Sequence, residues 1–242
     1  MKKKRFFIRL ILIIIFGFLI YYIGFRENNP IGVRGFIIKE TNLEIDITAL
    51  KQNNSDIYAW VRIPNTRIDY PILQGMDKEE GFYLTHDMHL EKNMYGAVYT
   101  EKENNQDFTS RHAVVYGHNM LDGSMFGGLH HFQEESFLRN NRFFYIYLEK
   151  EKLTYEIFAA YQFRDIHLLK TFPVNEEVTY REYLEMIPTL VEESGGNYIQ
   201  NINMDAESTI VTLSTCTNAN DTNRFLVQGV LVKREEMTRG DY

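Results

Sequence analysis

A pair of strand-forming segments near the C-terminus constrains the fold more than any other part of the chain. Both segments, Thr209–Thr215 and Phe225–Val232, are rich in β-branched and apolar residues, and Asn, Asp and Thr predominate in the link between them. Two such runs joined by turn-forming residues indicate adjacent antiparallel strands. The pairing predicts that Cys216, at the end of the first strand, faces Arg224, at the start of the second. The sequence therefore places a thiol beside a guanidinium at one edge of a sheet.

This predicted pair has a definite chemistry. A guanidinium beside a thiol favours the thiolate, which is the nucleophilic form. It can also donate to the oxyanion that forms when the thiolate attacks a carbonyl. Because side chains alternate along a strand, Thr212 and Ser214 are expected on the same side as Cys216. Taken alone, a cysteine at the end of an apolar strand is more often a buried small hydrophobic residue.

One histidine is predicted at a comparable position. The run His112–Tyr116 indicates a strand, and Gly117 places His118 in a turn at its end. A neutral imidazole can take a proton from a thiol, and an imidazolium can give one to a leaving amine. Strand ends are where a rigid scaffold displays functional side chains, and the other histidines lie in loops, in a link between elements or beside a glycine pair. His118 is therefore the predicted acid/base partner of the thiol.

The rest of the chain predicts short strands and few helices. Strand patterns occur in Ile57–Leu73, Gly96–Thr100, Phe143–Leu148 and Leu153–Phe163, and helical patterns in Glu176–Glu192 and in part of Phe36–Asn54. Seven or eight short strands favour a closed barrel or a sandwich. Hydrophobic residues make up 44% of the 242 residues, which is enough to bury a sizeable core.

Composition excludes several functions. A net charge of −7 gives no electrostatic support for binding nucleic acid. The single cysteine excludes an internal disulfide and a structural zinc site built on several cysteines.

The N-terminal segment differs from everything that follows it. Residues 1–5 form a basic cap, and residues 6–25 are apolar apart from Arg9. About 20 such residues span a bilayer as a helix. No small-residue cleavage site follows, so we expect an uncleaved transmembrane anchor rather than a removed signal peptide. The positive-inside rule then leaves the N-terminus in the cytoplasm and the remainder of the chain outside, on a single-pass membrane protein.

Three separated segments resemble the sortase family, in the order in which the family carries them. The sequence TLSTC at residues 212–216, with Arg224 a few residues later, resembles the family's active-site signature. Residues 114–129, VVYGHNMLDGSMFGGL, resemble its histidine-bearing segment, and residues 56–75 resemble the start of its domain. The TLSTC motif, the Tyr-Gly-His-Asn-Met segment and the helix at 176–192 resemble class B. The resemblance divides the chain into a linker and N-terminal helical region at 26–55, a catalytic domain at 56–233 and a charged tail at 234–242.

The resemblance implies a closed sortase-type β-barrel of seven to eight strands with a few peripheral helices. It implies a cysteine transpeptidase on a Gram-positive cell surface, which cleaves a C-terminal sorting signal of the type Asn-Pro-x-Thr-(Asn/Gly/Ser). The freed carboxyl of the surface protein is then joined to an amine of the peptidoglycan precursor. By the same resemblance Cys216 is the nucleophile that forms a thioester. His118 is then the general acid/base, and Arg224 holds the substrate and stabilises the oxyanion.

The resemblance also implies substrate contacts. These are Ser214, Thr215 and Thr217, and the Thr217 backbone N–H is expected to be a second oxyanion donor. No metal and no cofactor is implied for class B, and the sequence shows no obvious carboxylate cluster for calcium. Some class B members carry an acidic residue after the cysteine, where this chain has Thr217.

Two other functions fit parts of the pattern. One is a surface cysteine peptidase that passes the acyl group to water, and it shares the first half of the reaction with a transpeptidase. An added amine distinguishes them, because only a transpeptidase makes a new amide. The other is a non-catalytic, membrane-anchored binding module, in which Cys216 would be buried and unreactive towards thiol reagents.

Overall fold

The computed structural model describes residues 45–173, 176–217 and 223–237. The predicted basic cap at 1–5, the transmembrane segment at 6–25 and most of the linker lie outside the described residues. Within the described ranges, no helix has both the length and the apolar character needed to cross a membrane.

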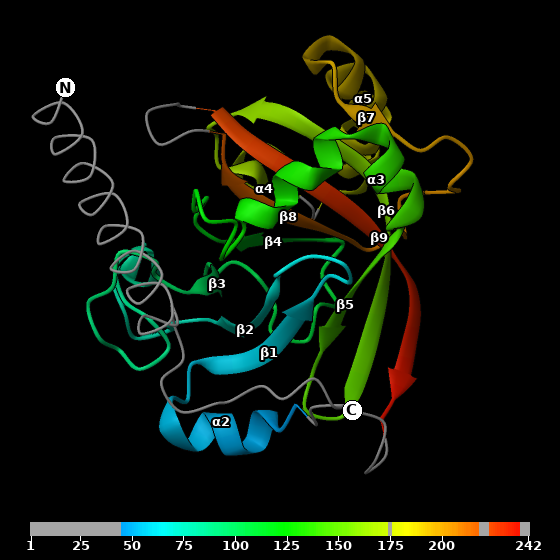
Figure 1. Ribbon diagram of the computed structural model, residues 1–242. Helices are drawn as coiled ribbons and strands as arrows, with labels where there is room; N and C mark the ends of the chain where they lie inside the picture. Colours follow the sequence, from blue (N-terminus) through cyan, green and yellow to red (C-terminus); the bar gives the residue numbers. More distant parts are fainter. Residues whose placement is uncertain (1–44, 174–175, 218–222, 238–242) are drawn as a thin grey trace, which may run out of the picture. The chain divides into compact units, whose positions relative to one another are not determined.

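The strands of the described chain form one sheet that closes on itself (Figure 1). They are β1 (Ile57–Arg62), β2 (Asp69–Leu73), β3 (Val98–Thr100), β4 (His112–Tyr116), β5 (Phe143–Tyr147), β6 (Glu151–Arg164), β7 (Asn197–Tyr198), β8 (Ile210–Cys216) and β9 (Asn223–Glu236). The order is β5-β1-β2-β3-β4-β8-β9-β6-β7, and a further β5–β6 pairing closes a ring of eight strands with β7 attached to β6. The predicted mainly-β barrel is confirmed.

The side chains of β8 alternate between the inside and the outside of the barrel. On β8, Val211 and Leu213 point into the barrel, where they pack against interior residues such as Val115 and Val227. Ile210 points to the outside and packs under a helix. Fully burying a large apolar side chain stabilises the fold by about 1.5–3 kcal/mol. Because Val211 and Leu213 fill the inside of the barrel, only the other face of β8 is available to a site. That face carries the even-numbered residues of the strand.

A few helices cover the outside of the barrel. They are α2 (Ile47–Asn53), η1 (Phe82–Leu84), η2 (Gly127–Gln133), α3 (Glu135–Asn140), α4 (Leu168–Thr171) and α5 (Glu177–Ser194). Figure 1 shows α2 and α5 on opposite sides of the barrel. The buried stripe of α5 has helical spacing and includes Tyr180, Tyr183 and Ile187. The helix ends at Gly195, whose φ of 66° is in the left-handed region that glycine adopts without strain. The predicted helix at 176–192 is thus confirmed.

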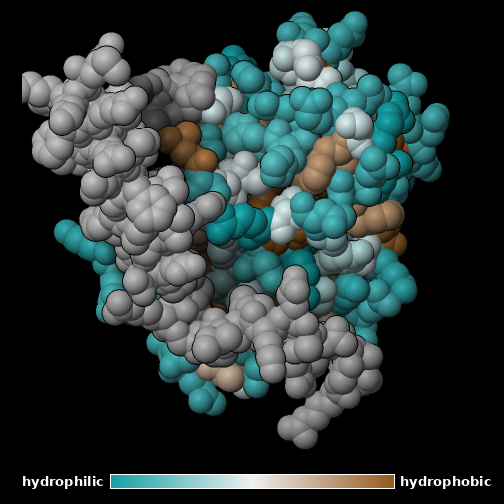
Figure 2. Space-filling model, in the orientation of Figure 1, coloured by the Kyte–Doolittle hydropathy of each residue, from teal (hydrophilic) through white to brown (hydrophobic). Residues whose placement is uncertain are grey.

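The last strand is longer than the sequence predicts. β9 continues to Glu236, so the first residues of the predicted tail at 234–242 belong to the barrel. They pair with the start of β6, and Arg234 forms an ion pair with Glu151 at 2.6 Å. Charged side chains on this exposed end gave no strand signal in the sequence. On the face seen in Figure 2, hydrophilic residues predominate and apolar residues occupy only small areas.

Candidate active site

Parallel pairing of β4 with β8 brings two predicted site residues to the same end of the barrel. Tyr116 pairs with Ser214 in the last register position. The chain then continues from β4 into Gly117 and His118, while β8 continues into Cys216. Parallel strands end at the same edge of a sheet, so residues about 100 positions apart in sequence become neighbours.

Hydrogen bonds join the histidine segment to the cysteine strand. The Gly117 N–H donates to the Ser214 carbonyl at 3.2 Å, and the Thr215 hydroxyl donates to the Gly117 carbonyl at 2.8 Å. The Asn119 amide donates to the Thr217 carbonyl at 3.1 Å. Glycine is required at 117, because a Cβ atom there would lie 2.7 Å from the ring of Phe126. The turn that carries His118 is therefore fixed relative to β8.

Cys216 and Arg224 are opposite each other in the β8–β9 hairpin, as the sequence predicts. Arg224 Nη1 lies 2.7 Å from Cys216 Sγ. Burial on its own would lower the pKa of Arg224, but the Asp165 carboxylate and the Cys216 sulfur outweigh it and raise the pKa above its usual range. The guanidinium is thus a permanent cation in contact with the sulfur.

A second group holds the other side of the guanidinium. Asp165 follows β6, and its carboxylate accepts from Arg224 Nε at 2.8 Å and from Nη2 at 3.0 Å. This is the two-point geometry in which a carboxylate and an arginine interact most strongly. The sequence analysis did not identify Asp165, because nothing in its local pattern relates it to Arg224.

A cleft of about 350 Å³ opens over these residues. Cys216, His118 and Arg224 all line it, and so does Ser214. Its other walls are aromatic, aliphatic and acidic, and include Leu84, Tyr99, Glu101, Tyr116, Phe163, Asp165, His167, Leu168 and Leu226. A cleft of this size with apolar walls and a few convergent polar groups suits a peptide segment.

A backbone carbonyl of another cleft residue orients His118. His118 Nε2 donates to the Leu84 carbonyl at 2.7 Å. Because a carbonyl only accepts, Nε2 carries the proton of the neutral ring, and Nδ1 is the nitrogen that can exchange a proton. His118 is thus oriented by a main-chain atom, for which a sequence gives no signature.

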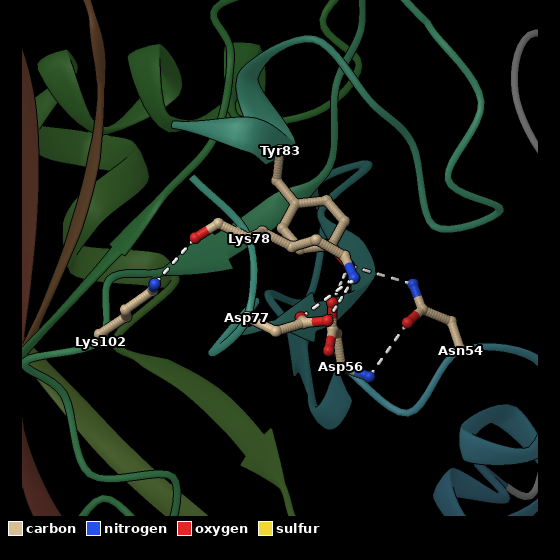
Figure 3. Close-up of polar contacts among 6 residues, drawn as sticks. All are labelled: Asn54, Asp56, Asp77, Lys78, Tyr83 and Lys102. Carbon is tan, nitrogen blue, oxygen red and sulfur yellow. Dashed lines mark hydrogen bonds and ion pairs between the residues drawn. The ribbon is translucent and has the colours of Figure 1, made fainter. Parts of the chain in front are cut away.

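Polar contacts hold η1, which contains Leu84, and the loop before it (Figure 3). The Tyr83 hydroxyl donates to Asp56 Oδ2 at 2.6 Å, and Asn54 Nδ2 donates to the Tyr83 oxygen at 3.2 Å. The Lys102 ammonium donates to the Lys78 carbonyl at 2.8 Å. Burial and the hydrogen bond to Asp56 raise the pKa of Tyr83, so it stays a neutral donor.

Two of the three predicted substrate contacts lie away from the cleft. Thr215 is 1% exposed and is turned towards the Gly117 carbonyl, because it alternates with Ser214 and Cys216 along β8. Thr217 is buried, and its N–H donates to the Asn223 carbonyl at 3.2 Å. The expected second oxyanion donor is therefore already engaged in the hairpin. Ser214 alone of the three lines the cleft.

His130 lies behind the cysteine, which the sequence analysis did not predict. Its Nε2 donates to the Cys216 carbonyl at 3.2 Å, and its Nδ1 accepts from Gln133. Its ring stacks on Phe225 with centroids 4.9 Å apart. Burial lowers the pKa of His130, which keeps the ring neutral. His130 therefore supports the backbone of Cys216 rather than facing the thiol.

The structure also gathers possible metal ligands that the sequence analysis missed. Donor atoms of Glu101, Glu103 and His167 all lie within 4.8 Å of one another. The two glutamates follow β3 and the histidine follows β6, so only the folded barrel brings them together. Burial raises the pKa of Glu101, although His167 and the Tyr116 hydroxyl oppose the shift. His167 Nε2 lies 3.0 Å from a carboxylate oxygen of Glu101, and Glu103 pairs with Lys170 at 3.5 Å.

Known proteins resemble this chain in sequence and in fold. A family model described as the sortase domain matches residues 61–232. The chain is 32% identical to sortase B of Listeria monocytogenes over 193 residues, which is 78% of this chain and 75% of that protein. The solved structure of Clostridium perfringens sortase B has 30% identity and a TM-score of 0.66, covering 77% of this chain and 99% of that one. A Streptococcus pyogenes class B sortase involved in pilus biogenesis has 30% identity and a TM-score of 0.67, covering 77% and 98%.

A closed eight-stranded barrel with cysteine, histidine and arginine side chains in one cleft, together with these likenesses, defines a class of cysteine transpeptidases. The chain belongs to the sortase family. Its similarity to the sortase B proteins places it in class B.

Proposed function

We propose that this enzyme cleaves a sorting signal of the type Asn-Pro-x-Thr-(Asn/Gly/Ser) and joins the freed carboxyl to a peptidoglycan amine. The observation that carries the proposal is the 2.7 Å contact between Arg224 Nη1 and Cys216 Sγ, in a cleft that His118 also lines. The predicted N-terminal anchor supports a place on the outer face of the cell membrane, where sorting signals and peptidoglycan precursors meet.

The first half-reaction uses each of the three side chains. His118 Nδ1 takes the proton of the Cys216 thiol, the sulfur attacks the threonine carbonyl carbon, and the carbonyl oxygen becomes an oxyanion. The Arg224 N–H that contacts the sulfur is close enough to donate to this oxygen. The bond from carbon to the leaving nitrogen then breaks, and the departing amine takes a proton from His118. A thioester between Cys216 and the surface protein is left.

The second half-reaction reverses these roles. The acceptor amine attacks the thioester carbon and gives its proton to His118 Nδ1. The sulfur leaves as a thiolate, which the adjacent guanidinium stabilises. The product is a new amide, and the thiol and imidazole return to their starting forms. Ser214 lines the cleft beside the sulfur and contacts the bound signal in this proposal.

A peptide assay tests the proposal. The full-length chain in detergent is incubated with a fluorescence-quenched Asn-Pro-Gln-Thr-Asn peptide, with and without triglycine as the acceptor amine. We expect cleavage, and an amide-linked product when the amine is present. Cleavage that gives only the free acid with a panel of amines would indicate a peptidase that uses water. No cleavage of any related peptide would contradict the proposed substrate class.

A further inference from the structure

Asp165 lies immediately after β6 and contacts Arg224 at the second position of β9. The β6–β9 ladder places Phe163 opposite Arg224, so Asp165 lies two residues beyond the pair, where it lines the cleft. Its two carboxylate oxygens accept from Nε and Nη2 of the guanidinium at 2.8 and 3.0 Å. Asp165 therefore occupies Nε and Nη2, which lie on the side of the guanidinium that faces away from the thiol.

This contact decides which edge of the guanidinium faces the sulfur. A guanidinium is planar, so fixing Nε and Nη2 fixes the direction of Nη1 as well. Nη1 is the atom that lies 2.7 Å from Cys216 Sγ. An arginine without such a partner samples many rotamers and would bring Nη1 to the reacting atoms only part of the time. Thr217, which follows Cys216, carries no charge that could take over this function.

The exposure of the two side chains indicates that the Asp165–Arg224 ion pair orients the guanidinium more than it stabilises the fold. The side chains of Arg224 and Asp165 are 32% and 47% exposed. Ion pairs at this level of exposure stabilise a fold only slightly, so a variant that lacks the carboxylate is expected to fold. The effect of losing it should therefore appear in the reaction rate.

We propose that Asp165 is a positioning residue, which holds the guanidinium of Arg224 so that Nη1 reaches the sulfur and the oxyanion. The inference rests on the proposed function of Cys216 and Arg224. Asp165 itself touches no reacting atom and acts through Arg224.

Steady-state kinetics with the full-length chain and the quenched Asn-Pro-Gln-Thr-Asn peptide provide the first test. Asp165→Asn removes the charge at nearly constant shape, and we expect kcat to fall by about 10- to 100-fold with KM changed less than about twofold. Asp165→Glu keeps a carboxylate and should restore part of the rate. The matched control is Asp69→Asn, because Asp69 accepts the same fork from Arg62 at 2.9 and 3.3 Å but does not line the cleft. A loss in the control equal to that in Asp165→Asn would overturn the proposal.

A double-mutant cycle separates positioning from a general structural effect. Single-turnover acylation is compared for Arg224→Ala with and without Asp165→Asn. If Asp165 acts through Arg224, the second substitution adds no further loss, because its target is absent. Losses that multiply, or an unchanged kcat in Asp165→Asn alone, would show that Asp165 has no positioning role.

A measurement without substrate keeps this inference separate from the proposed function. If the wild-type chain cleaves no sorting peptide, the proposed function fails, and NMR of the arginine Nε–H groups still decides on Asp165. We expect the Arg224 Nε–H signal to exchange slowly with water in the wild type and to be lost or broadened in Asp165→Asn. The same signal with the same exchange rate in both proteins would overturn the assignment.

Discussion

Single atoms decide what the three cleft residues can do. Arg224 divides its donors between Asp165 and the Cys216 sulfur, so one side chain is both anchored and reactive. His118 donates from Nε2 to the Leu84 carbonyl, which leaves Nδ1 to carry the proton of the reaction. In each case the bond that orients the group is separate from the bond that it makes in the chemistry. Such separation is how a site is organised before the substrate arrives.

Replacing Arg224 by alanine should abolish most of the activity while the protein stays folded. The substitution removes a principal oxyanion donor, and such a loss costs about 10²–10³ in rate. Peptide cleavage measured beside thermal unfolding checks both parts. Near-normal turnover in Arg224→Ala would refute the function proposed for the guanidinium.

His118→Ala should be inactive and should still contain a free thiol. The variant lacks the group that protonates the leaving amine, a contribution of about 10²–10⁴ in rate. His131→Gln is the control, because His131 packs against Phe137 and does not line the cleft. If His131→Gln lost activity and His118→Ala retained it, the acid/base assignment would be wrong.

At the scale of elements, the sequence predicts the part of the site that lies on two strands adjacent in the chain. It does not predict the part that comes from segments distant in the chain. The β8–β9 hairpin and the opposition of Cys216 and Arg224 follow from two apolar runs and a polar link. The alternation that puts Ser214 beside Cys216 also turns Thr215, which we expected to contact the substrate, towards the Gly117 carbonyl. Asp165 could not be found in this way, because only the closure of β6 onto β9 brings it to Arg224.

The short helix η1 carries both Tyr83 and Leu84 and provides an element-scale prediction. Tyr83→Phe removes a donor from Asp56 and should lower the free energy of unfolding by about 1–3 kcal/mol, since a partly buried carboxylate loses a charge-assisted hydrogen bond. It should also lower kcat, because the Leu84 carbonyl that orients His118 is less well held. Urea unfolding and peptide kinetics measure the two effects.

Tyr58→Phe is the matched control for that substitution. Tyr58 is another buried tyrosine, whose hydroxyl bonds to Thr100 at 2.8 Å. We expect a smaller loss of stability and an unchanged kcat. Equal effects of the two substitutions on kcat would show that the Tyr83 network has no special connection to the site.

At the scale of the whole molecule, His112 belongs to a buried polar network between the barrel and α5. His112 is 1% exposed, its Nε2 bonds to the Thr212 hydroxyl at 2.8 Å, and Gln228 donates to the same hydroxyl. The imidazole also stacks on Tyr183 of α5. Burial lowers the pKa of His112 to about 3, so the ring stays neutral in the folded protein. Periodicity in the sequence gave the strand but not this buried network, which needs residues from distant strands.

This buried ring predicts how stability depends on pH. His112 in the unfolded chain takes up a proton near its ordinary pKa of 6.5, whereas in the folded protein it does so only near 3. The unfolded state therefore binds more protons between these values, and stability falls as the pH is lowered through this window. The contribution is about 1.4 kcal/mol per pH unit. His112→Gln should show a correspondingly weaker acid dependence in urea unfolding, and identical curves for the two proteins would contradict the account.

The central claim is that Cys216 carries the acyl group between donor and acceptor. The most direct test is intact-mass spectrometry of the full-length chain after rapid mixing with the sorting peptide. The account predicts a mass increase equal to the acyl fragment, located on Cys216, discharged by an amine as an amide product and absent in Cys216→Ala. Turnover without such an adduct at Cys216, or an adduct that persists in Cys216→Ala, would contradict it.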